Sequence, residues 1–309
     1  MKLPAEPLPQ APEWIAVDWG TTHLRATAMG PAGAIARAAS TDGMGSLQPD
    51  QFEAALLALI NPWLAAGRVT PVIACGMVGS RQGWAEAKYR PVPCMPAAPE
   101  ALTRVAVKDP RISVQIAPGL SQASPADVMR GEETQIAGAL ALMPDFDGVI
   151  CLPGTHSKWV HVSVGEVVSF QTFLTGELFA LLSTQSVLRH SIAEAGFDAE
   201  AFDQALSDAL SRPERIAAKL FSLRAEGLLA PAASPASAIA ARSRLSGLLI
   251  GIELAASKPY WLGQPVTLIG AQALCDHYAR ALQAQGLNPT FLSASDCTLA
   301  GLSKLKGAL

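Results

Sequence analysis

Two glycine-threonine segments have the residue types that bind phosphate. In the first, Asp18 follows a short apolar run and comes just before Gly20, Thr21 and Thr22. The backbone N–H groups of such a turn and its two hydroxyls can bind phosphate oxygens, and Arg25 on the following strand would project toward them. The Asp18 carboxylate suits Mg²⁺, which proteins hold with one or two carboxylates plus nucleotide phosphates. The alternative is a plain hairpin in which Asp18 only accepts hydrogen bonds at a strand end.

The second segment is Gly154-Thr155-His156-Ser157-Lys158. It could bind the same phosphates from the opposite side, with Thr155, Ser157 or Lys158 donating hydrogen bonds or charge. Because phosphoryl transfer spreads charge over the equatorial oxygens, two opposed turns would catalyse it by positioning and electrostatic stabilisation. Pro153 stands where the first segment has an acid, so no metal ligand is expected on this side. Alone, this hairpin would be an ordinary tight turn.

Glu132 and Glu133 open a predicted helix over residues 132–142. Acids in a first helical turn interact favourably with the helix dipole, which explains one of them. A pair beside Arg130 and Gly131 exceeds what capping needs, and one carboxylate could accept the proton of an attacking sugar hydroxyl. The residues do not decide between Glu132 and Glu133.

A glycine-lined loop precedes an aromatic residue at 76–84. Gly79 and Ser80 in this loop could contact a sugar, and Trp84 could lie against its ring, although Trp84 is equally suited to core packing. A substrate carboxylate would be bound best by arginine, because the guanidinium binds it through two hydrogen bonds. The basic residues in or near these loops, which otherwise are solvated surface charges, are Arg81, Lys88, Arg90 and Arg130.

Two segments in the second half carry weaker signals. Thr175 and Glu177 begin a helix, where they either cap it or support substrate binding. A strand at 266–269 is followed by Gly270 and Ala271 and then by a helix, and such a strand-glycine-helix unit is a candidate border for a nucleotide.

The elements that must position these residues occur twice. In each case the order is strand, glycine-threonine turn, strand, glycine turn, strand. The first strands are predicted at 14–18, 23–29 and 34–38, and the second at 149–152, 158–162 and 167–172. Two such units predict an internally duplicated α/β architecture.

Helices and further strands complete each half. The first half adds a helix at 52–64, a strand at 72–74 and the helix at 132–142. The second half carries a helical insertion with helices at 177–190, 199–210, 214–223 and 236–256, and the Pro- and Ala-rich residues 229–235 are predicted as a surface loop. After the strand at 266–269 come a helix at 273–285, a strand at 290–292 and a final helix opened by Asp296.

Composition excludes several classes of protein. The 309 residues include 23 Lys and Arg against 26 Asp and Glu, a net charge of −3, whereas nucleic-acid binding requires a basic excess. No membrane span is predicted, since the longest apolar stretch, 245–256, is short and contains Glu253. Five cysteines without a C-x-x-C pair, and histidines without metal-ligand spacing, favour a cytoplasmic protein with reduced thiols and no structural metal. Residues 1–12 are interpreted as a flexible leader that lacks the pattern of a signal peptide.

Five motifs in one order resemble those of the 2-dehydro-3-deoxygalactonokinase family. They are Asp18-Trp19-Gly20-Thr21-Thr22, Gly76-Met77-Val78-Gly79-Ser80, Arg130-Gly131-Glu132-Glu133-Thr134-Gln135, Pro153-Gly154-Thr155-His156 and Thr175-Gly176-Glu177-Leu178. The resemblance runs from about Trp14 to the C-terminal helix. It implies the sugar kinase, Hsp70 and actin superfamily, with two RNase H-like (actin-like ATPase) domains of α/β class, here 13–145 and 146–309, and ATP and substrate in the cleft between them.

The resemblance also implies the reaction, which is ATP-dependent phosphorylation of the keto-deoxy sugar acid 2-dehydro-3-deoxy-D-galactonate at its 6-hydroxyl, in D-galactonate catabolism. Carried over to this sequence, it places Mg²⁺ at Asp18, phosphates at Gly20–Thr22 and Gly154–His156, and adenosine at Gly270 and Ala271. Related kinases commonly use Asp as the base, whereas this chain offers Glu132 and Glu133 at the corresponding position.

Other functions are weighed against this one. Within the class, the alternative is another acidic small-molecule kinase such as one of the type III pantothenate kinase kind. From a different class, a non-catalytic ATP-binding module of the Hsp70 or actin kind would need a separate peptide-binding domain. A sugar-sensing regulator would need a helix-turn-helix, for which a leader of 12 residues leaves no room. The apolar helices after Glu177 are compatible with a symmetric homodimer.

Overall fold

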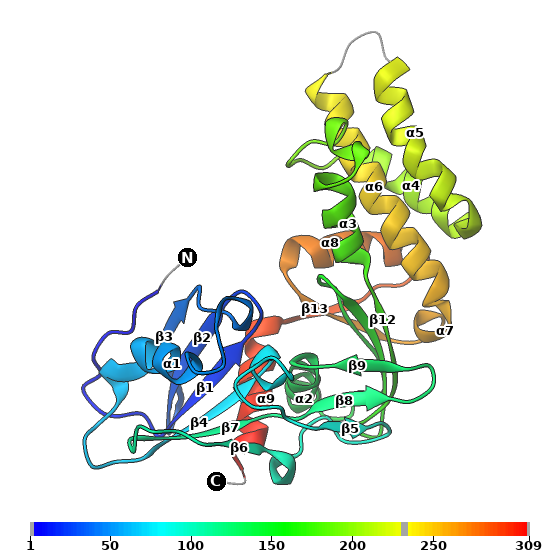
Figure 1. Ribbon diagram of the computed structural model, residues 1–309. Coiled ribbons are helices and arrows are strands. Elements are labelled where there is room, and N and C mark those ends of the chain that lie inside the picture. The colour runs from blue at the N-terminus through cyan, green and yellow to red at the C-terminus, as the bar shows by residue number, and fades with distance from the viewer. Residues whose placement is uncertain (1–2, 230–233, 308–309) are drawn as a thin grey trace. The chain divides into compact units, whose positions relative to one another are not determined.

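The computed structural model describes residues 3–229 and 234–307, which form two compact units (Figure 1). Unit 1 comprises Met1–Phe146, Val162–Ser169 and Ser293–Leu309, and unit 2 comprises Asp147–His161 and Phe170–Leu292. The predicted ranges 13–145 and 146–309 differ from this division at residues 146, 162–169 and 293–309. Val167 pairs with Cys94 of unit 1, and residues 293–309 contain a helix that packs in unit 1.

Unit 1 is built on a six-stranded sheet. Its strands are β1 (Trp14–Trp19), β2 (Leu24–Gly30), β3 (Gly33–Ser40), β4 (Thr70–Cys75), β6 (Thr103–Val105) and β7 (Ile112–Ile116). The order is β3-β2-β1-β4-β7-β6, with β1 antiparallel to β2 and parallel to β4. The predicted three-stranded meander at the start of the chain is therefore confirmed.

The two faces of strand β1 are buried against different helices. Because side chains alternate along a strand, Ile15, Val17 and Trp19 share one apolar cluster with α1 (Phe52–Ile60). Trp14 and Ala16 belong to a second cluster, on the opposite face, which contains residues of α9 (Ala294–Lys306). In Figure 1, α1 lies against the β1–β3 part of the sheet. Burial on both faces explains why β1 is apolar everywhere except at Asp18.

Helices α2 (Glu132–Leu142) and α9 cross closely within unit 1 because each has a glycine at the contact. A methyl group on Gly138 would overlap the backbone carbonyl of Cys297, and one on Gly301 would overlap the carbonyl of Thr134. Without side chains at these two positions, the backbones approach directly. The crossing fixes the height of α2 relative to the sheet, and therefore the position of its first turn.

Replacing Gly138 by Ala is expected to lower the free energy of unfolding by about 2–3 kcal/mol, because the added methyl group has no space in a packed interior. Urea unfolding of the wild type and the variant measures this difference. Gly227 in α5 (Ile216–Leu229) is the matched control, since it is helical, exposed and close only to the Ser191 side chain, and Ala there is expected to be neutral or stabilising. An unchanged midpoint for Gly138→Ala would contradict the role of the crossing.

Unit 2 repeats the strand order of unit 1. Its strands are β10 (Gly148–Leu152), β11 (Ser157–Ser163), β12 (Glu166–Phe173), β13 (Val266–Gly270) and β14 (Thr290–Ser293). The order β12-β11-β10-β13-β14 matches β3-β2-β1-β4-β7, and β10 and β13 are parallel, as β1 and β4 are. The tip of the β11–β12 hairpin groups with unit 1. The predicted internal duplication is confirmed by this common strand order.

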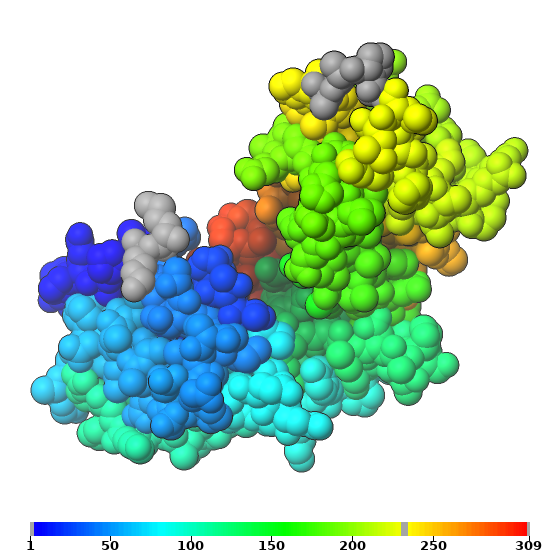
Figure 2. Space-filling model, turned by 45° about the horizontal axis from the view of Figure 1, so that its top comes forward, coloured from blue at the N-terminus to red at the C-terminus, as the bar shows by residue number. Residues whose placement is uncertain are grey.

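A helical insertion separates β12 from β13 in unit 2. It contains α3 (Thr175–Thr184), α4 (Ala199–Ser211), α5, α6 (Pro235–Ala256) and α7 (Lys258–Trp261), and α8 (Gln272–Gln283) follows β13. Gly247 and Gly251 allow α6 to lie directly against α4. Figure 2 shows the part of the insertion from α3 to α6, green to yellow, as one packed surface. Of the predicted loop at 229–235, residues 230–233 lie outside the described residues.

Several elements differ from the sequence predictions. The helix expected at 52–64 ends at Ile60, and Pro62 lies in a following 3₁₀ turn. The helix expected at 177–190 begins at Thr175 and ends at Thr184, after which Ser186 caps a separate 3₁₀ turn. A three-stranded sheet of short strands was not predicted; it contains β5 (Tyr89–Pro91), β8 (Gly119–Gln122) and β9 (Asp127–Met129). Further 3₁₀ turns lie at Met44–Ser46, Met77–Gly79, Pro99–Ala101 and Pro213–Arg215.

The predicted flexible leader has contacts in unit 1. Leu3 pairs with Ala39 on the edge strand β3, and the carbonyl of Glu6 accepts a hydrogen bond from the Trp63 indole at 3.0 Å. An extended segment of this kind satisfies the free backbone groups of an edge strand. Among the described residues, no helix combines the length and the apolar character needed to cross a bilayer.

Candidate active site

Asp18 lies at the carboxyl end of β1, beside the equivalent end of the parallel strand β4. Asp18 pairs with Cys75 in the register of β1 and β4, and with Arg25 in the register of β1 and β2. The Asp18 side chain is 35% exposed, and its Oδ2 accepts a hydrogen bond from the Arg25 guanidinium at 3.1 Å. Desolvation raises the pKa of Asp18, and the charges of Arg25 and His23 oppose this shift. Ends of parallel strands are where α/β proteins bind ligands.

The first turn of α2 approaches these strand ends through a contact between two glycines. Gly76 and Gly131 both have positive φ, 94° and 104°, and a side chain on Gly131 would lie 3.2 Å from the Gly76 Cα. Glu133, at this turn, acts on the same thiol as Asp18: after burial itself, the charges of both carboxylates raise the pKa of Cys75. Two carboxylates from separate segments therefore converge on Cys75.

The environments of the two glutamates are different. The Glu133 side chain is buried, and it accepts hydrogen bonds from the Gly131 N–H at 2.6 Å and from the Thr134 hydroxyl at 3.0 Å. Burial and the neighbouring charge of Glu132 raise the pKa of Glu133 to about 7, against these hydrogen bonds. Glu132 is only half-buried and accepts from the Arg130 N–H at 3.2 Å. Glu133 has the pKa that a general base needs near neutral pH.

The turn after β1 presents its threonines to solvent. The carbonyls of Gly20 and Thr21 accept hydrogen bonds from the backbone of Met44 and Gly45, at 3.0 and 2.9 Å. A side chain at Gly43 would overlap the backbone of this turn, so the backbone at Gly43 packs directly against it. Thr21 and Thr22 are exposed, and their hydroxyls are accessible to a ligand.

The residues predicted to contact a sugar lie in unit 1 around a buried arginine. Arg130 lies over the Tyr89 ring at 4.3 Å and donates from Nη2 to the Ala87 carbonyl at 2.7 Å. Gly79 makes space for it, since a side chain there would lie 3.0 Å from Nη1. Within the described residues, Nε and Nη1 of Arg130 and the Ser80 hydroxyl are buried without a hydrogen-bond partner.

Trp84 lies in an aromatic cluster of the core of unit 1. Its ring is stacked with Phe52 at 6.3 Å and meets the edge of Trp19 at 5.9 Å. These contacts are the ones expected if Trp84 packs in the core and not against a sugar ring, and its indole is half-buried.

The second hairpin, Gly154–His156, is held by the first turn of α3. A side chain on Gly176 would overlap the carbonyl of Gly154, and the Glu177 N–H donates to the Thr155 carbonyl at 2.9 Å. The carboxylate of Glu177 also lies 2.6 Å from His156 Nε2, with both side chains nearly half exposed. Lys158 is buried on β11, where its ammonium lies 3.5 Å from the His156 carbonyl. Glu177 therefore supports this hairpin, while Thr155 and His156 stay accessible.

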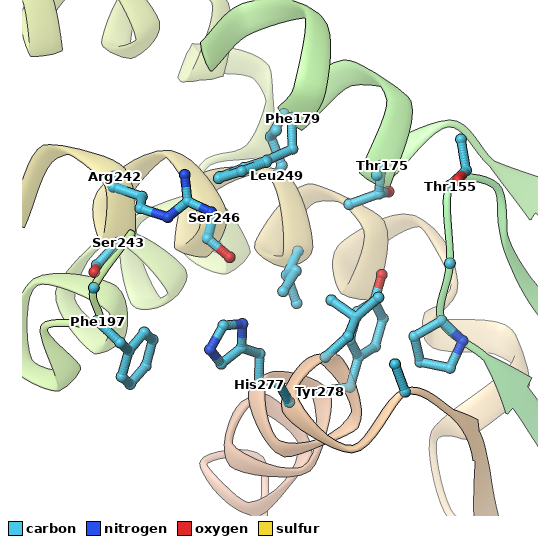
Figure 3. A pocket seen from close by; sticks show the side chains of 18 residues that line it. Thr155, Thr175, Phe179, Phe197, Arg242, Ser243, Ser246, Leu249, His277 and Tyr278 are labelled. Atoms are coloured by element: carbon cyan, nitrogen blue, oxygen red, sulfur yellow. The ribbon is translucent and has the colours of Figure 1, made fainter. Parts of the chain in front are cut away.

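A cavity of about 440 Å³ opens beside this hairpin in unit 2 (Figure 3). In the view of Figure 3, Thr155 and Thr175 lie at one end, and Phe197, Arg242 and His277 lie at the other. Ala271, predicted to border adenosine, lines this cavity, and its neighbour Gly270 packs against the Pro153 carbonyl. The volume is in the usual range for small-molecule sites.

The far end of the cavity is aromatic. The Phe197 and His277 rings are stacked with centroids 4.5 Å apart, and the Arg242 guanidinium lies over Phe179 at 4.9 Å. Burial, together with the Arg242 charge, lowers the pKa of His277 against the effect of Asp276, so the imidazole is neutral at pH 7. Sequence reasoning missed all of these lining residues, because they come from four separate helices and loops and have no common spacing.

The fold and the glycine-threonine hairpins of the two units define the class of protein. Each unit has the RNase H-like strand order, with a glycine-threonine hairpin after its first strand, and this is the actin-like ATPase fold found in sugar kinases.

The chain belongs to a particular family of this class. A family model described as 2-keto-3-deoxy-galactonokinase matches residues 18–305, so the chain is a member of that family. It is 39% identical, over 96% of its length and 97% of the relative, to the Rhizobium meliloti "Probable 2-dehydro-3-deoxygalactonokinase DgoK1". It is 35% identical to the 2-dehydro-3-deoxygalactonokinase of Escherichia coli, over 96% of this chain and 98% of that relative.

A solved structure agrees with this assignment. The crystal structure of a Sinorhizobium meliloti protein that carries the same kinase description has a TM-score of 0.86 and 38% identity. The similarity covers 96% of this chain and 98% of that one. The predicted family and fold class are confirmed.

Proposed function

We propose that this protein transfers the γ-phosphoryl group of ATP to the 6-hydroxyl of 2-dehydro-3-deoxy-D-galactonate, giving the 6-phosphate in D-galactonate catabolism. The family membership supports this substrate and reaction. The observation that carries the chemistry is the buried carboxyl of Glu133, with a pKa of about 7, which shares the environment of Cys75 with Asp18.

Glu133 is the general base in this proposal. Its carboxylate accepts the proton of the 6-hydroxyl while that oxygen bonds to the γ-phosphorus and the bond from phosphorus to ADP breaks. Glu132 is not assigned this role, because its side chain is only half-buried, whereas that of Glu133 is buried. Of the two acids left open by the sequence, the structure favours Glu133.

Asp18 is proposed to hold Mg²⁺ together with the phosphates of ATP. The partly exposed carboxylate at a strand end, three residues before the accessible Thr21 and Thr22 hydroxyls begin, is an oxygen donor of the type that this ion prefers. When bound, Mg²⁺ would neutralise charge on the β- and γ-phosphates. Among the described residues, no group of three or more His, Cys, Asp and Glu is placed to hold a metal.

The unit 2 cavity is proposed to bind the nucleotide. Thr155 and His156 would donate to the phosphates, while Ala271, Phe197 and His277 would contact the adenosine. A neutral, stacked imidazole and a phenyl ring suit a flat aromatic base. In unit 1, the Gly20–Thr22 turn is proposed to bind phosphate through its backbone N–H groups and its two hydroxyls.

Arg130 and Ser80 are proposed to bind the sugar acid. The Nε and Nη1 donors of Arg130 are unpartnered in the described structure, so the guanidinium has hydrogen bonds left to donate to a carboxylate. Gly79 permits this position of the guanidinium. Trp84 would contribute only by fixing the loop that carries these residues.

Mass spectrometry tests the proposed reaction. The enzyme is incubated with ATP, Mg²⁺ and 2-dehydro-3-deoxy-D-galactonate, and the acid is expected to gain the mass of one phosphate group. The gluconate epimer and pantothenate, as parallel acceptors, test the strictness of the substrate and the alternative kinase. A gain on pantothenate alone, or on none of the three, would overturn the proposal.

Replacing Ala273 by Trp is expected to weaken ADP binding by about ten-fold or more, because the indole occupies the cavity that Ala273 lines. Isothermal titration calorimetry of the wild type and the variant measures the dissociation constant. Ala284→Trp is the matched control, since Ala284 is exposed at the other end of α8 and does not line the cavity. Equal affinities for the two variants would place the nucleotide elsewhere.

A further inference from the structure

A buried carboxylate lies behind the unit 2 cavity and is not part of the chemistry described so far. Glu253, on α6, is 1% exposed. Its Oε1 accepts a hydrogen bond from the Trp159 indole at 2.8 Å, and its Oε2 accepts one from the Tyr278 hydroxyl at 2.7 Å. Thr175 and Ser157 also hydrogen-bond to the carboxyl group.

These four partners come from the elements that form the nucleotide site. Ser157 and Trp159 begin β11, directly after the second hairpin, and Thr175 is the first residue of α3. Tyr278 is on α8, and its hydroxyl also lies 2.8 Å from the Ser157 hydroxyl. Thr175 and Tyr278 line the cavity, whereas Glu253 does not. The Glu253 carboxylate therefore connects α3, α8 and the start of β11, next to the second hairpin, from a position outside the cavity.

The hydrogen bonds fit an ionised carboxylate. A carboxylate has two oxygens that only accept, and the indole, tyrosine and threonine groups can all donate to it, while the single Ser157 proton is shared between Glu253 and the Tyr278 hydroxyl. Burial raises the pKa of Glu253, and these hydrogen bonds lower it. An isolated buried charge is unfavourable. A buried carboxylate that accepts several hydrogen bonds holds its donors rigidly, because each donor that moved away would leave the charge without a partner.

We propose that Glu253 is a positioning residue of the nucleotide site, which fixes Thr175 and the Gly154–His156 hairpin in the arrangement that binds ATP. The proposal rests on the proposed function, since it takes ATP as the ligand of this cavity. Glu253 touches neither nucleotide nor sugar. It acts through the position of Thr175, of Tyr278 and of the hairpin backbone.

The first test is Glu253→Gln, which keeps the shape but places an amide donor against donors of the network. ADP affinity by calorimetry and kcat/KM for ATP are each expected to fall by about ten-fold or more, and KM for the sugar acid is expected to stay within about two-fold. Leu254→Ala is the matched control, because Leu254 is the next residue of α6, is buried in the same core and makes none of these hydrogen bonds. It is expected to lower the Tm while leaving ADP affinity unchanged below the transition.

Tyr278→Phe is the second variant, because it removes one donor to Glu253 and leaves the ring in place. Its ADP affinity is expected to fall by about three-fold or more, and the double variant is expected to bind no more weakly than Glu253→Gln alone. Wild-type affinity in both single variants would overturn the positioning role. Equal rises in KM for ATP and for the sugar acid would also overturn it. If the wild type itself does not bind ADP, the proposed function fails instead.

Discussion

Asp18→Asn is expected to lower kcat by about three orders of magnitude, because in the proposed function the Asp18 carboxylate holds Mg²⁺ at the phosphates, and a neutral amide would not hold it. Thermal unfolding is expected to change little. The pair with Arg25 is partly exposed, and exposed ion pairs contribute only about 0–1 kcal/mol. Steady-state kinetics at saturating ATP, together with a thermal scan, measures both quantities.

Asp109→Asn is the control for this variant. Asp109 is also in unit 1 and also pairs with an arginine, Arg111, at 2.7 Å, but it is not among the residues assigned to the site. Its turnover is expected to equal that of the wild type. A kcat for Asp18→Asn within about two-fold of the wild-type value would remove Asp18 from the mechanism.

Glu133→Gln is expected to lower kcat by about 10²–10⁴-fold, the range that a general base contributes. The wild-type rate should rise with pH through the Glu133 pKa, which is about 7, because only the ionised carboxylate accepts the proton of the hydroxyl. The residual rate of the variant should lack this rise. Glu132→Gln is the control: its rate at high pH should match that of the wild type, and the rise should remain but move to lower pH, because the charge that helps to raise the Glu133 pKa has been removed. Loss of both the rate and the rise in this variant alone would assign the base to Glu132.

The same carboxyl links stability to pH. Its pKa is raised from 4.5 in the unfolded chain to about 7 in the folded protein, so between these values the folded state holds a proton that the unfolded state has lost. Stability contributed by Glu133 is therefore complete below pH 4.5 and is lost as the pH rises toward 7, by an amount on the order of a few kcal/mol. Urea unfolding across this window should show a shallower decline for Glu133→Gln than for the wild type.

The elements with strong local signals could be predicted from the sequence. Strands β1 to β3 and β10 to β12 alternate with glycine turns, and α2 begins at a pair of acids, so their positions were predicted within a few residues. The same signals identified Asp18 and the two hairpins as candidates. They could not decide between Glu132 and Glu133, because the difference in their burial depends on how α2 packs.

The remaining features depend on contacts between distant segments. Strands β5, β8 and β9 have three or four residues each, which is too short for a periodic pattern. Phe197, Arg242 and His277 meet only after the helical insertion has folded. Glu253 was visible in the sequence only as a charge that interrupts an apolar stretch, and its four partners are 25 or more positions away, such as Tyr278 at 25 and Trp159 at 94.

The place of α9 has a consequence for the order in which the protein can be completed on the ribosome. Leu302 and Leu305 of this helix are part of the apolar cluster that contains Trp14 and Ala16. The backbone at Gly301 packs directly against Thr134 of α2. The segments of unit 1 that are synthesised first must therefore wait, with one face of their sheet uncovered, until the final helix has left the exit tunnel. The segments of unit 2, all of which precede that helix, have no such delay.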